Sequence, residues 1–350
     1  MTRLVCPALR NDDTLGFLAA LGLLELCGSA LHLHPSLGWE GQGGAAVLDV
    51  EVENLDELAA RLHAVAASMA AEDLVTPAPW SKLVPARLSK LQRDALKVQL
   101  GNEMPPNDTL RMPAATAASH YREAQARELE SGGGDPLSAR WLVALVSQLA
   151  SDAKARRIAP LLPMSNQMTA YQQLRSFRDV VIATPVLLSE ALVRWHRVGD
   201  QPKHKGIGAG AYLDSRALRD AVTTGSGETD NLAVAGATWL ALNAIPFFPQ
   251  AGEARRGRAV GWAAVRGQGF ELVWPVWTEL LDRAAVSCLL SHPAVPAPSP
   301  SRDHRISSAS VNRRRRELVA LGVIAVCRSA RRPLPNSNGV LLPPRIESIP

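Results

Sequence analysis

The chain has 350 residues, of which 47% are hydrophobic and 20% are charged, and this globular balance excludes a chain that is disordered throughout. It has neither a window of about 18 uncharged apolar residues nor an opening segment of signal-peptide type, so we expect a cytoplasmic protein without a membrane span. A net charge of +5 favours an anionic partner such as nucleic acid.

The cysteines indicate neither a zinc site nor a redox site. Cys6, Cys27, Cys288 and Cys327 lie far apart in apolar stretches and form no CxxC pair. We therefore expect buried free thiols in a reducing compartment, and no cofactor.

Residues 1–130 predict an N-terminal α+β domain. Residues 14–27 are apolar on nearly all sides and follow three candidate cap residues, which is typical of a buried helix. Residues 37–54 combine a Gly-rich turn with alternating polar and apolar positions, the pattern of a half-exposed strand. Residues 56–70 place apolar side chains at helical spacing and predict a second helix.

Residues 137–292 predict a helical domain. The preceding ESGGGDP, residues 130–136, suits a linker because three consecutive glycines are costly in any regular element. The expected helices are 137–149, 169–181, 186–197, 214–222, 230–243 and 276–290.

Residues 293–350 predict an arginine-rich C-terminal segment. A Pro/Ser-rich loop over residues 293–305 precedes a helix that Ser310 caps, and a strand and a turn follow over residues 322–339. We expect this segment to end as a β-hairpin. The whole chain is then an α+β fold, predominantly helical, with a short sheet near its N-terminus.

The densest positive charge is the run Arg313, Arg314, Arg315 and Arg316, on the first turns of the helix that Ser310 caps. At ~100° per residue these side chains point around the whole helix, so at least two must face solvent. Guanidinium pairs bidentately with phosphate, and a helix N-terminus attracts anions. The run predicts a phosphate-binding surface; the alternative is a solvated charged turn packed beside Glu317.

Other basic and polar residues near the run would enlarge this surface. They are Arg302, His304, Arg305, Asn312, Arg328, Arg331 and Arg332.

Residues 165–178, SNQMTAYQQLRSFR, form a second candidate interface. Arg175 and Arg178 are three residues apart and share a helix face, and Asn166 and Gln167 precede them. Amide and guanidinium groups suit sugar–phosphate and base-edge contacts. The alternative is a polar face that only meets solvent.

Residues 201–212 form a third candidate, in which Lys203 and Lys205 precede glycines. Glycines let a backbone approach phosphates closely, but no GK[ST] ending makes this a nucleotide-binding motif. The segment is either a basic loop that becomes ordered on nucleic acid or a plain disordered loop.

Two more basic clusters lie elsewhere in the chain. Arg255, Arg256 and Arg258 come shortly before Trp262, and arginine with an aromatic ring suits stacking on unpaired bases. Trp262, Trp274 and Trp277 are more often core residues, which is the alternative. Lys82 and Arg87 lie in segment 76–92, which prolines interrupt, and this pattern indicates a basic surface segment.

Motifs for catalysis are lacking, since the sequence contains no HExxH, GxSxG or DxD cluster. The spaced pair His32 and His34 is a weak metal signal. Asp303 and His304 lack the further carboxylates that hold a metal pair. We expect a protein that is not an enzyme, and a metal-dependent nuclease is the remaining alternative.

Several blocks of sequence are distinctive: NDDTLGFLAALGLLELCG, LGWEGQGGAAVL, LRSFRDVV, LAVAGATWLALNAIPFFPQ, WPVWTELL and LVALGVIAVCRSARRPLPNSNGVLLPP. Together these blocks resemble proteins encoded in type I CRISPR loci. The similarity is greatest to the large-subunit or accessory proteins of subtype I-G, formerly I-U. None of the blocks is a catalytic signature.

The resemblance implies a non-catalytic subunit of a crRNA-guided surveillance complex, or Cascade, of antiviral defence. Its implied partners are crRNA, double-stranded target DNA, the other effector subunits and a helicase-nuclease. Such a subunit recognises a short flanking motif, the PAM, helps to open the duplex and docks the helicase-nuclease, while guide pairing carries sequence specificity.

Within that role, the polar and loop contacts are assigned to Asn166, Gln167, Lys203, Lys205 and Asn312. The chain is short for a large subunit, so a small-subunit function is fused, missing or supplied by another protein. The alternative function is a structural scaffold that contacts only guide RNA or protein partners.

Overall fold

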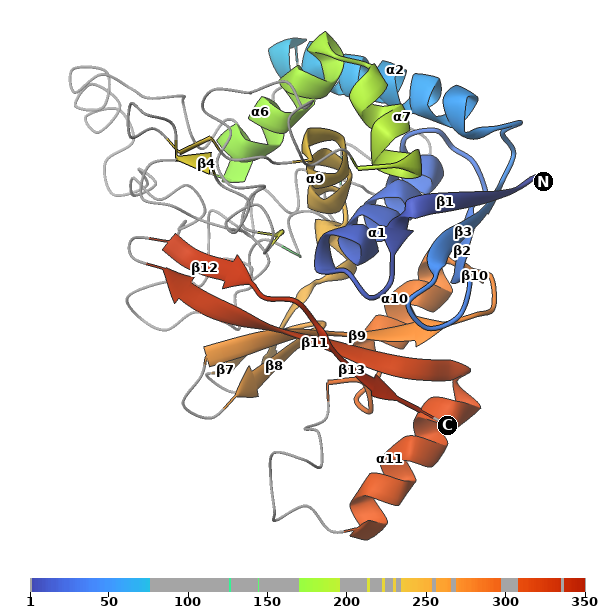
Figure 1. The fold of residues 1–350 in the computed structure, drawn as a ribbon, viewed down its shortest axis with the longest axis vertical. Helices are drawn as coiled ribbons and strands as arrows, with labels where there is room; N and C mark the ends of the chain where they lie inside the picture. The colour runs from blue at the N-terminus through green and yellow to red at the C-terminus, as the bar shows by residue number, and fades with distance from the viewer. Residues whose placement is uncertain are drawn as a thin grey trace.

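Figure 1 shows the computed structural model of the chain, in which helices and antiparallel sheets occupy separate layers. The structure describes residues 2–75, 126, 144, 170–195, 213–214, 222–223, 229–230, 234–253, 256–265, 269–296, 308–334 and 337–349. This arrangement confirms the α+β class expected from the sequence.

The first sheet joins the N-terminal part to a distant strand. Its order is β1 (Thr2–Arg10), β3 (Ala45–Val50), β2 (Ser36–Trp39) and β10 (Leu281–Asp282). All neighbours are antiparallel, and Leu281 lies opposite Leu37. Buried and exposed side chains alternate along much of β1, as in a strand with one buried face.

The second sheet is built around β11 (Val323–Leu334). Its order is β12 (Ser337–Leu341), β11, β9 (Gly269–Trp277) and β8 (Trp262–Val265), and β13 (Arg345–Ser348) also pairs with β11. The predicted C-terminal strand is present, and β13 follows the hairpin as a further strand that was not predicted from the sequence. Two short pairs lie outside these sheets: β4 (Val222–Thr223) with β5 (Thr229–Asp230), and β6 (Gln250–Glu253) with β7 (Arg256–Ala259).

The expected helix over residues 276–290 is wrong at its start. The chain remains in β9 through Trp277, and α10 spans Arg283–Ser291. Residues 273–277 are Val-Trp-Pro-Val-Trp, whose β-branched and aromatic side chains suit a strand and whose proline disfavours a helix. The side chain of Asp282 accepts a hydrogen bond from the Ala285 backbone at 2.7 Å, so the helix begins after this cap.

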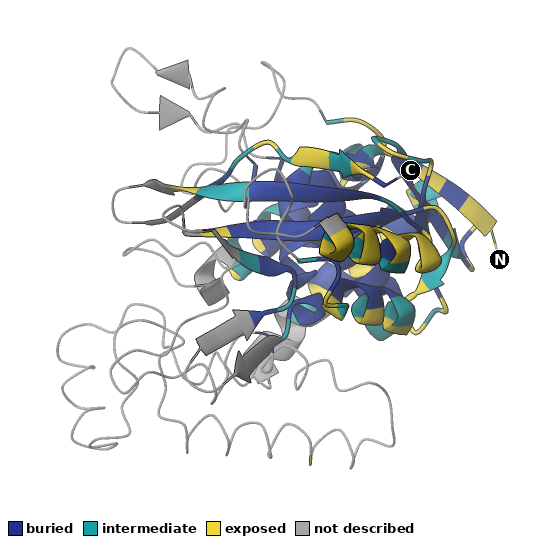
Figure 2. Ribbon diagram, turned by 90° about the horizontal axis from the view of Figure 1, so that it is seen from below, coloured by how far each residue is buried: buried dark blue, intermediate teal, exposed yellow. Residues whose placement is uncertain are grey.

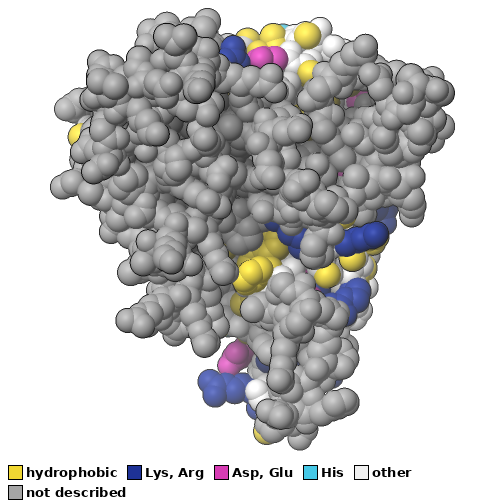
Figure 3. All heavy atoms as spheres, turned by 90° about the vertical axis from the view of Figure 1, so that its left-hand side faces the viewer, with side chains coloured by type: hydrophobic (Ala, Val, Ile, Leu, Met, Phe, Trp, Pro, Cys, Tyr) yellow, Lys and Arg dark blue, Asp and Glu magenta, His cyan; other side chains and the backbone are white. Residues whose placement is uncertain are grey.

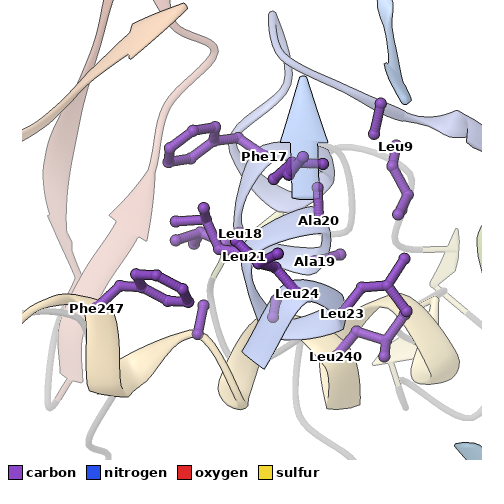
Figure 4. Close-up of a cluster of buried hydrophobic side chains, with 14 of the residues drawn as sticks. Leu9, Phe17, Leu18, Ala19, Ala20, Leu21, Leu23, Leu24, Leu240 and Phe247 are labelled. Atoms are coloured by element: carbon purple, nitrogen blue, oxygen red, sulfur yellow. The ribbon is translucent and has the colours of Figure 1, made fainter. Parts of the chain in front are cut away.

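Five further helices pack on the first sheet and against one another. They are α1 (Thr14–Ser29), α2 (Leu55–Val75), α6 (Ala170–Ala183), α7 (Val186–Val193) and α9 (Ala235–Leu242), with a short 3-10 helix over Ile245–Phe247. Helix α1 is buried from Thr14 to Cys27, as its apolar sequence predicts. Figure 4 shows its leucines and Phe17 packed beside Leu240 and Phe247.

Tryptophan residues connect α1 to both sheets. The ring of Trp274 stacks on Phe17 with 5.0 Å between centroids, and Phe17 also stacks on Trp39 at 5.9 Å. The indole nitrogens of Trp274 and Trp277 each donate to a backbone carbonyl at 2.9 Å, in Asn11 and Leu37 respectively. Trp262, Trp274 and Trp277 are therefore core residues, which confirms the alternative noted from the sequence.

The hydrophobic core includes residues from all three predicted segments. The proposed linker, residues 130–136, lies outside the described residues, and the domain boundaries stay predictions. Of the expected helix over residues 214–222, only Asp214 and Val222 are described, and Val222 lies in a strand.

Helix α11 (Ser308–Ala320) lies against the second sheet on the side away from α1 (Figure 1). The helix begins before Ser310, so Ser310 lies within its first turn and is not its cap. Arg313 is the sixth residue of the helix, and the attraction of a helix N-terminus for anions fades within the first turn. The arginine run therefore gains little from that attraction.

Three of the four cysteines are buried, as expected, but Cys288 is exposed on α10. None of the helices in the described ranges has both the length and the apolarity needed to cross a membrane.

Candidate nucleic-acid interface

Helix α11 carries the arginine run with one residue turned inward. Arg313, Arg315 and Arg316 are exposed, as is Asn312, whereas Arg314 is largely covered. Buried Leu318 lies one helical turn beyond Arg314 and shares its side of the helix. The prediction that at least two arginines face solvent is confirmed. Viewed from below in Figure 2, the strands of the second sheet are largely buried and the outer side of α11 is exposed.

Arg314 anchors α11 to the sheet. Its Nε donates to the carbonyl oxygen of Ala294 at 2.8 Å, and its Nη1 donates to Oε1 of Glu347 at 2.7 Å. The side chain is 11% exposed, and Glu347 belongs to β13. Arg314 is thus engaged inside the protein and does not belong to the exposed surface.

The anchor continues into a network of charged side chains beneath the helix. Nη1 of Arg328 donates to Oε1 of Glu271 at 2.9 Å, and Nη2 of Arg345 donates to Oε2 of the same carboxylate at 3.1 Å. Nε of Arg328 lies 3.8 Å from Oε2 of Glu347. Burial lowers the pKa of Arg328 from its ordinary value, although the hydrogen bond to Glu271 opposes this shift. Arg328 is buried and does not enlarge the surface of the run.

The exposed arginines differ in how far their charge is neutralised. Nε of Arg313 donates to Oε1 of Glu317 at 2.9 Å, so the alternative of a charged turn packed beside Glu317 is correct for this residue. Arg315 and Arg316 form no ion pair with any part of the chain that the structure describes. Their positive charge faces solvent. We call Asn312, Arg313, Arg315 and Arg316 the α11 ridge.

Arg331 and Arg332 have different environments although they are neighbours in β11. Arg332 is exposed. The guanidinium of Arg331 instead lies over the ring of Trp262, with Cζ 5.0 Å from the ring centroid. The arginine that stacks on Trp262 is thus Arg331, which belongs to a strand distant in sequence. Arg331 does not extend the α11 ridge, because its polar atoms Nε and Nη2 are buried.

The second candidate interface is only partly exposed. Arg175 is exposed, and its Nε lies 3.6 Å from Oδ2 of Asp179. Arg178 is buried, and its Nη1 donates to the carbonyl oxygen of Met69 at 3.3 Å. The expected pairing of both arginines on one exposed face is therefore wrong, because Arg178 connects α6 to α2.

Several predicted contact residues cannot be placed. Lys82, Arg87, Asn166, Gln167, Lys203, Lys205, Arg255, Arg302 and Arg305 lie outside the described residues, as do Asp303 and His304. Arg256 and Arg258 belong to β7, and only the backbone of these two residues is described. Among the described side chains, no group of three or more His, Cys, Asp or Glu could hold a metal ion.

Figure 3 shows one face of the molecule, with the side chains of the described residues coloured by type. Basic side chains appear in the lower half of this face, at several points, and an acidic side chain accompanies them near the end where α11 lies. A basic side chain also appears at the top of this face, beside an acidic one, so the positive charge of this face is not confined to the second sheet and α11.

Comparison of the sequence with protein-family models and with curated proteins finds no match.

Proposed function

We propose that this chain is a non-catalytic subunit of a crRNA-guided type I CRISPR surveillance complex, and that the α11 ridge binds nucleic-acid phosphates. The sequence blocks that resemble type I CRISPR proteins support the proposal that the chain is a subunit of such a complex. The exposed charge of Arg315 and Arg316 supports the contact, and it is the observation on which the proposal depends. Guanidinium groups that lack a carboxylate partner remain available for phosphate oxygens.

The network beneath α11 supports a positioning role for this helix. Arg314 is held by Glu347 and by the Ala294 carbonyl, so the exposed arginines project from a helix with a defined orientation. Contacts to phosphates hold a protein in register on the nucleic acid and carry no sequence information. In the proposed complex, flanking-motif recognition, strand opening and docking of the helicase-nuclease would then use other surfaces.

The partners in this proposal are crRNA, double-stranded target DNA, the other effector subunits and the helicase-nuclease, in a cytoplasmic complex. Arg332 is a further exposed arginine on the second sheet. Arg175 of α6 is a separate candidate contact, because its side chain is half exposed, although Asp179 partly neutralises its charge.

A scaffold that binds protein partners is the second candidate function. Val319 and Leu321 are 51% and 38% exposed at the end of α11, and Ile346 of β13 is 40% exposed. Exposed apolar side chains of this size suit a contact with another subunit. Both functions can coexist on α11, because the apolar residues follow the arginines in sequence.

The salt dependence of DNA binding tests the ridge. In the assembled complex, R313A/R315A/R316A should weaken binding to target duplex and to unrelated duplex alike. Each lost phosphate contact lowers the slope of log K against log salt by about 0.9, so the triple variant should lose up to about 3. A slope equal to that of the wild type would contradict the proposal.

A charge-matched control removes three arginines elsewhere, in R3A/R61A/R194A. Arg3 and Arg194 are exposed on β1 and just after α7, and Arg61 is paired with Glu57 on α2. This control should retain the wild-type slope, because general loss of charge is a smaller effect than loss of direct contacts. Binding to crRNA but not to duplex would favour the scaffold.

A further inference from the structure

Helix α11 has an exposed side along most of its length. Among residues 309–320, Leu318 alone is buried. Leu318 and Arg314 attach one side of the helix to the rest of the protein, through the hydrophobic core and through Glu347. The side turned away from the sheet includes Val319, which is 51% exposed although it is apolar. A helix of 13 residues is marginal in water on its own, so a further packing partner would stabilise α11.

The exposed side of α11 is basic, with small and apolar residues at its C-terminal end. Arg313, Arg316 and Ala320 are spaced by three and then four residues, so they lie in one row along the helix. Asn312 and Val319 are seven residues apart and form the adjacent row. Arg316 has no ion pair with any residue that the structure describes. We call Arg313, Arg316 and Ala320 the basic row.

The start of α2 carries the opposite charge with the same spacing. Glu53, Asp56 and Ala60 are exposed and are also spaced by three and then four residues. Glu57 is engaged within the chain, because its Oε2 accepts a hydrogen bond from the Glu53 backbone at 2.7 Å and its Oε1 accepts one from Arg61. Glu53 and Asp56 form no ion pair with the described residues. We call Glu53, Asp56 and Ala60 the acidic row.

The two rows lie at opposite ends of the molecule. In Figure 1, where the longest axis is vertical, α2 lies at the top and α11 at the bottom. The rows therefore do not meet within one copy of the chain. The exposed residues that follow Ala60 on the same side of α2, Ala64 and Ala67, are small. No long side chain at these positions would keep a docked helix away from α2.

We propose that copies of this chain associate head to tail, with α11 of one copy docked on the start of α2 of the next. When the two helices run in the same direction, Arg313 and Arg316 lie opposite Glu53 and Asp56, and Val319 covers the small side chains that follow. Opposite charges across the contact select this arrangement. A contact between two different faces builds a ring or an open chain of copies. The inference rests on the second candidate function, a scaffold, and names its partner as a second copy.

Sedimentation velocity of the full chain without nucleic acid, at low salt, tests the association. The weight-average sedimentation coefficient of the wild type should rise with protein concentration. About 1 M salt should reverse this rise, because surface charges are then screened over a few ångströms. E53K/D56K and R313E/R316E should each raise the dissociation constant at least about tenfold, because like charges would then face each other.

Reversal of both rows in one chain is the decisive variant. E53K/D56K/R313E/R316E restores opposite charges across the contact and should associate as the wild type does. All four side chains are exposed, so each variant should keep the wild-type Tm.

Two further variants complete the set. E40K/E279K is the matched control, since it makes the same change of charge at exposed carboxylates elsewhere, and it should not alter the association. V319S removes an exposed apolar side chain without a change of charge and should weaken the association.

The same variants separate this association from the proposed nucleic-acid contact. E53K/D56K leaves the α11 ridge intact, so in the assembled complex it should keep the wild-type salt slope of duplex binding. Added duplex should dissociate the wild-type oligomer, because Arg316 cannot hold a phosphate and a carboxylate of another copy together. Duplex that binds without dissociating the oligomer would contradict the phosphate contact on the ridge and leave the association standing.

Three results would overturn the association itself. The first is a wild type that stays monomeric at every concentration in low salt. The second is an oligomer that E53K/D56K weakens no more than the control E40K/E279K does. The third is a failure of the four-residue reversal to restore association, which would show that the two rows do not face each other.

Discussion

Nη1 of Arg328 lies 2.9 Å from Oε1 of Glu271, and the two side chains are only 4% and 5% exposed. The pair joins β11 to β9 beneath α11. Removing one partner of a buried ion pair leaves the other charge uncompensated, which typically costs about 3–5 kcal/mol. We expect R328M and E271L each to lower the free energy of unfolding by an amount near this range, measured by urea denaturation.

The double variant R328M/E271L separates pairing from burial. Because both charges are then absent, it should be more stable than either single variant, and the double-mutant cycle should show strong coupling. Arg345 also contacts Glu271, but its side chain is 52% exposed, so R345M should have a smaller effect than R328M. Additive effects of R328M and E271L would contradict this account.

Neighbouring arginines of the run should differ in their effects on stability. R314M leaves Oε1 of Glu347 and the Ala294 carbonyl without their donor, which should cost about 1–3 kcal/mol. R313M removes only an exposed i,i+4 pair with Glu317 and should change the free energy of unfolding by less than about 0.5 kcal/mol. Chemical denaturation with a common m-value would measure both. Equal effects would show that Arg314 is no anchor.

Local sequence patterns predicted the helices better than the strands. Helix α1 follows from an unbroken apolar segment behind a polar turn, and α6 follows from apolar side chains at helical spacing. Strand β1 was missed, although buried and exposed residues alternate along it. Strand β9 was assigned in part to a helix. Strands depend on partners that are remote in sequence, as when Cys327 lies opposite Trp274.

The same limit applies to the candidate interface. Helical geometry alone predicted that several arginines of the run are exposed. It could not identify Arg314 as the buried one, because that depends on Glu347 in a strand 33 residues away. The stacking of Arg331 on Trp262 likewise depends on the order of three strands. No local signal in the sequence carries this information.

The cysteines should react very unequally. Cys288 is exposed, whereas Cys6, Cys27 and Cys327 are buried, and burial raises the pKa of each buried thiol to about 12. Because the thiolate is the reactive species, we expect a maleimide or disulfide reagent to label Cys288 alone in the native protein at pH 8. Unfolding in urea should make the three buried cysteines accessible to the reagent. Rapid native labelling of a second cysteine would contradict the buried positions.

The raised thiol pKa values also predict a loss of stability in alkali. An unfolded cysteine ionises near its ordinary pKa of 9.0, whereas native Cys6 keeps its proton up to about pH 12. Within this window the unfolded state binds fewer protons, so stability falls as pH rises, by about 1.4 kcal/mol per pH unit for each such thiol. Cys6→Ala should therefore flatten the fall between pH 9 and pH 10.5. Identical dependences of stability on pH in the wild type and in Cys6→Ala would contradict the prediction.

Gly22 permits the close crossing of α1 and α9. A Cβ at this position would overlap the carbonyl oxygen of Leu240, and it would also approach the backbone nitrogen of Ala244 at 3.2 Å. Both atoms belong to the backbone, so the helices must separate to make room. The resulting strain and lost packing typically cost about 1–3 kcal/mol, and we expect Gly22→Ala near the upper end of this range.

Gly28 on the same helix provides the matched control. A Cβ there would meet Nη1 of the Arg283 side chain at 3.5 Å, an ordinary contact. Gly28→Ala should therefore be neutral or should gain up to about 1 kcal/mol from the higher helix propensity of alanine. Chemical denaturation of the two variants compares the same chemical change at two positions of one helix. If both variants lose stability equally, the close approach at Gly22 is not what requires glycine; if Gly22→Ala alone is destabilised, the contact with Leu240 is responsible.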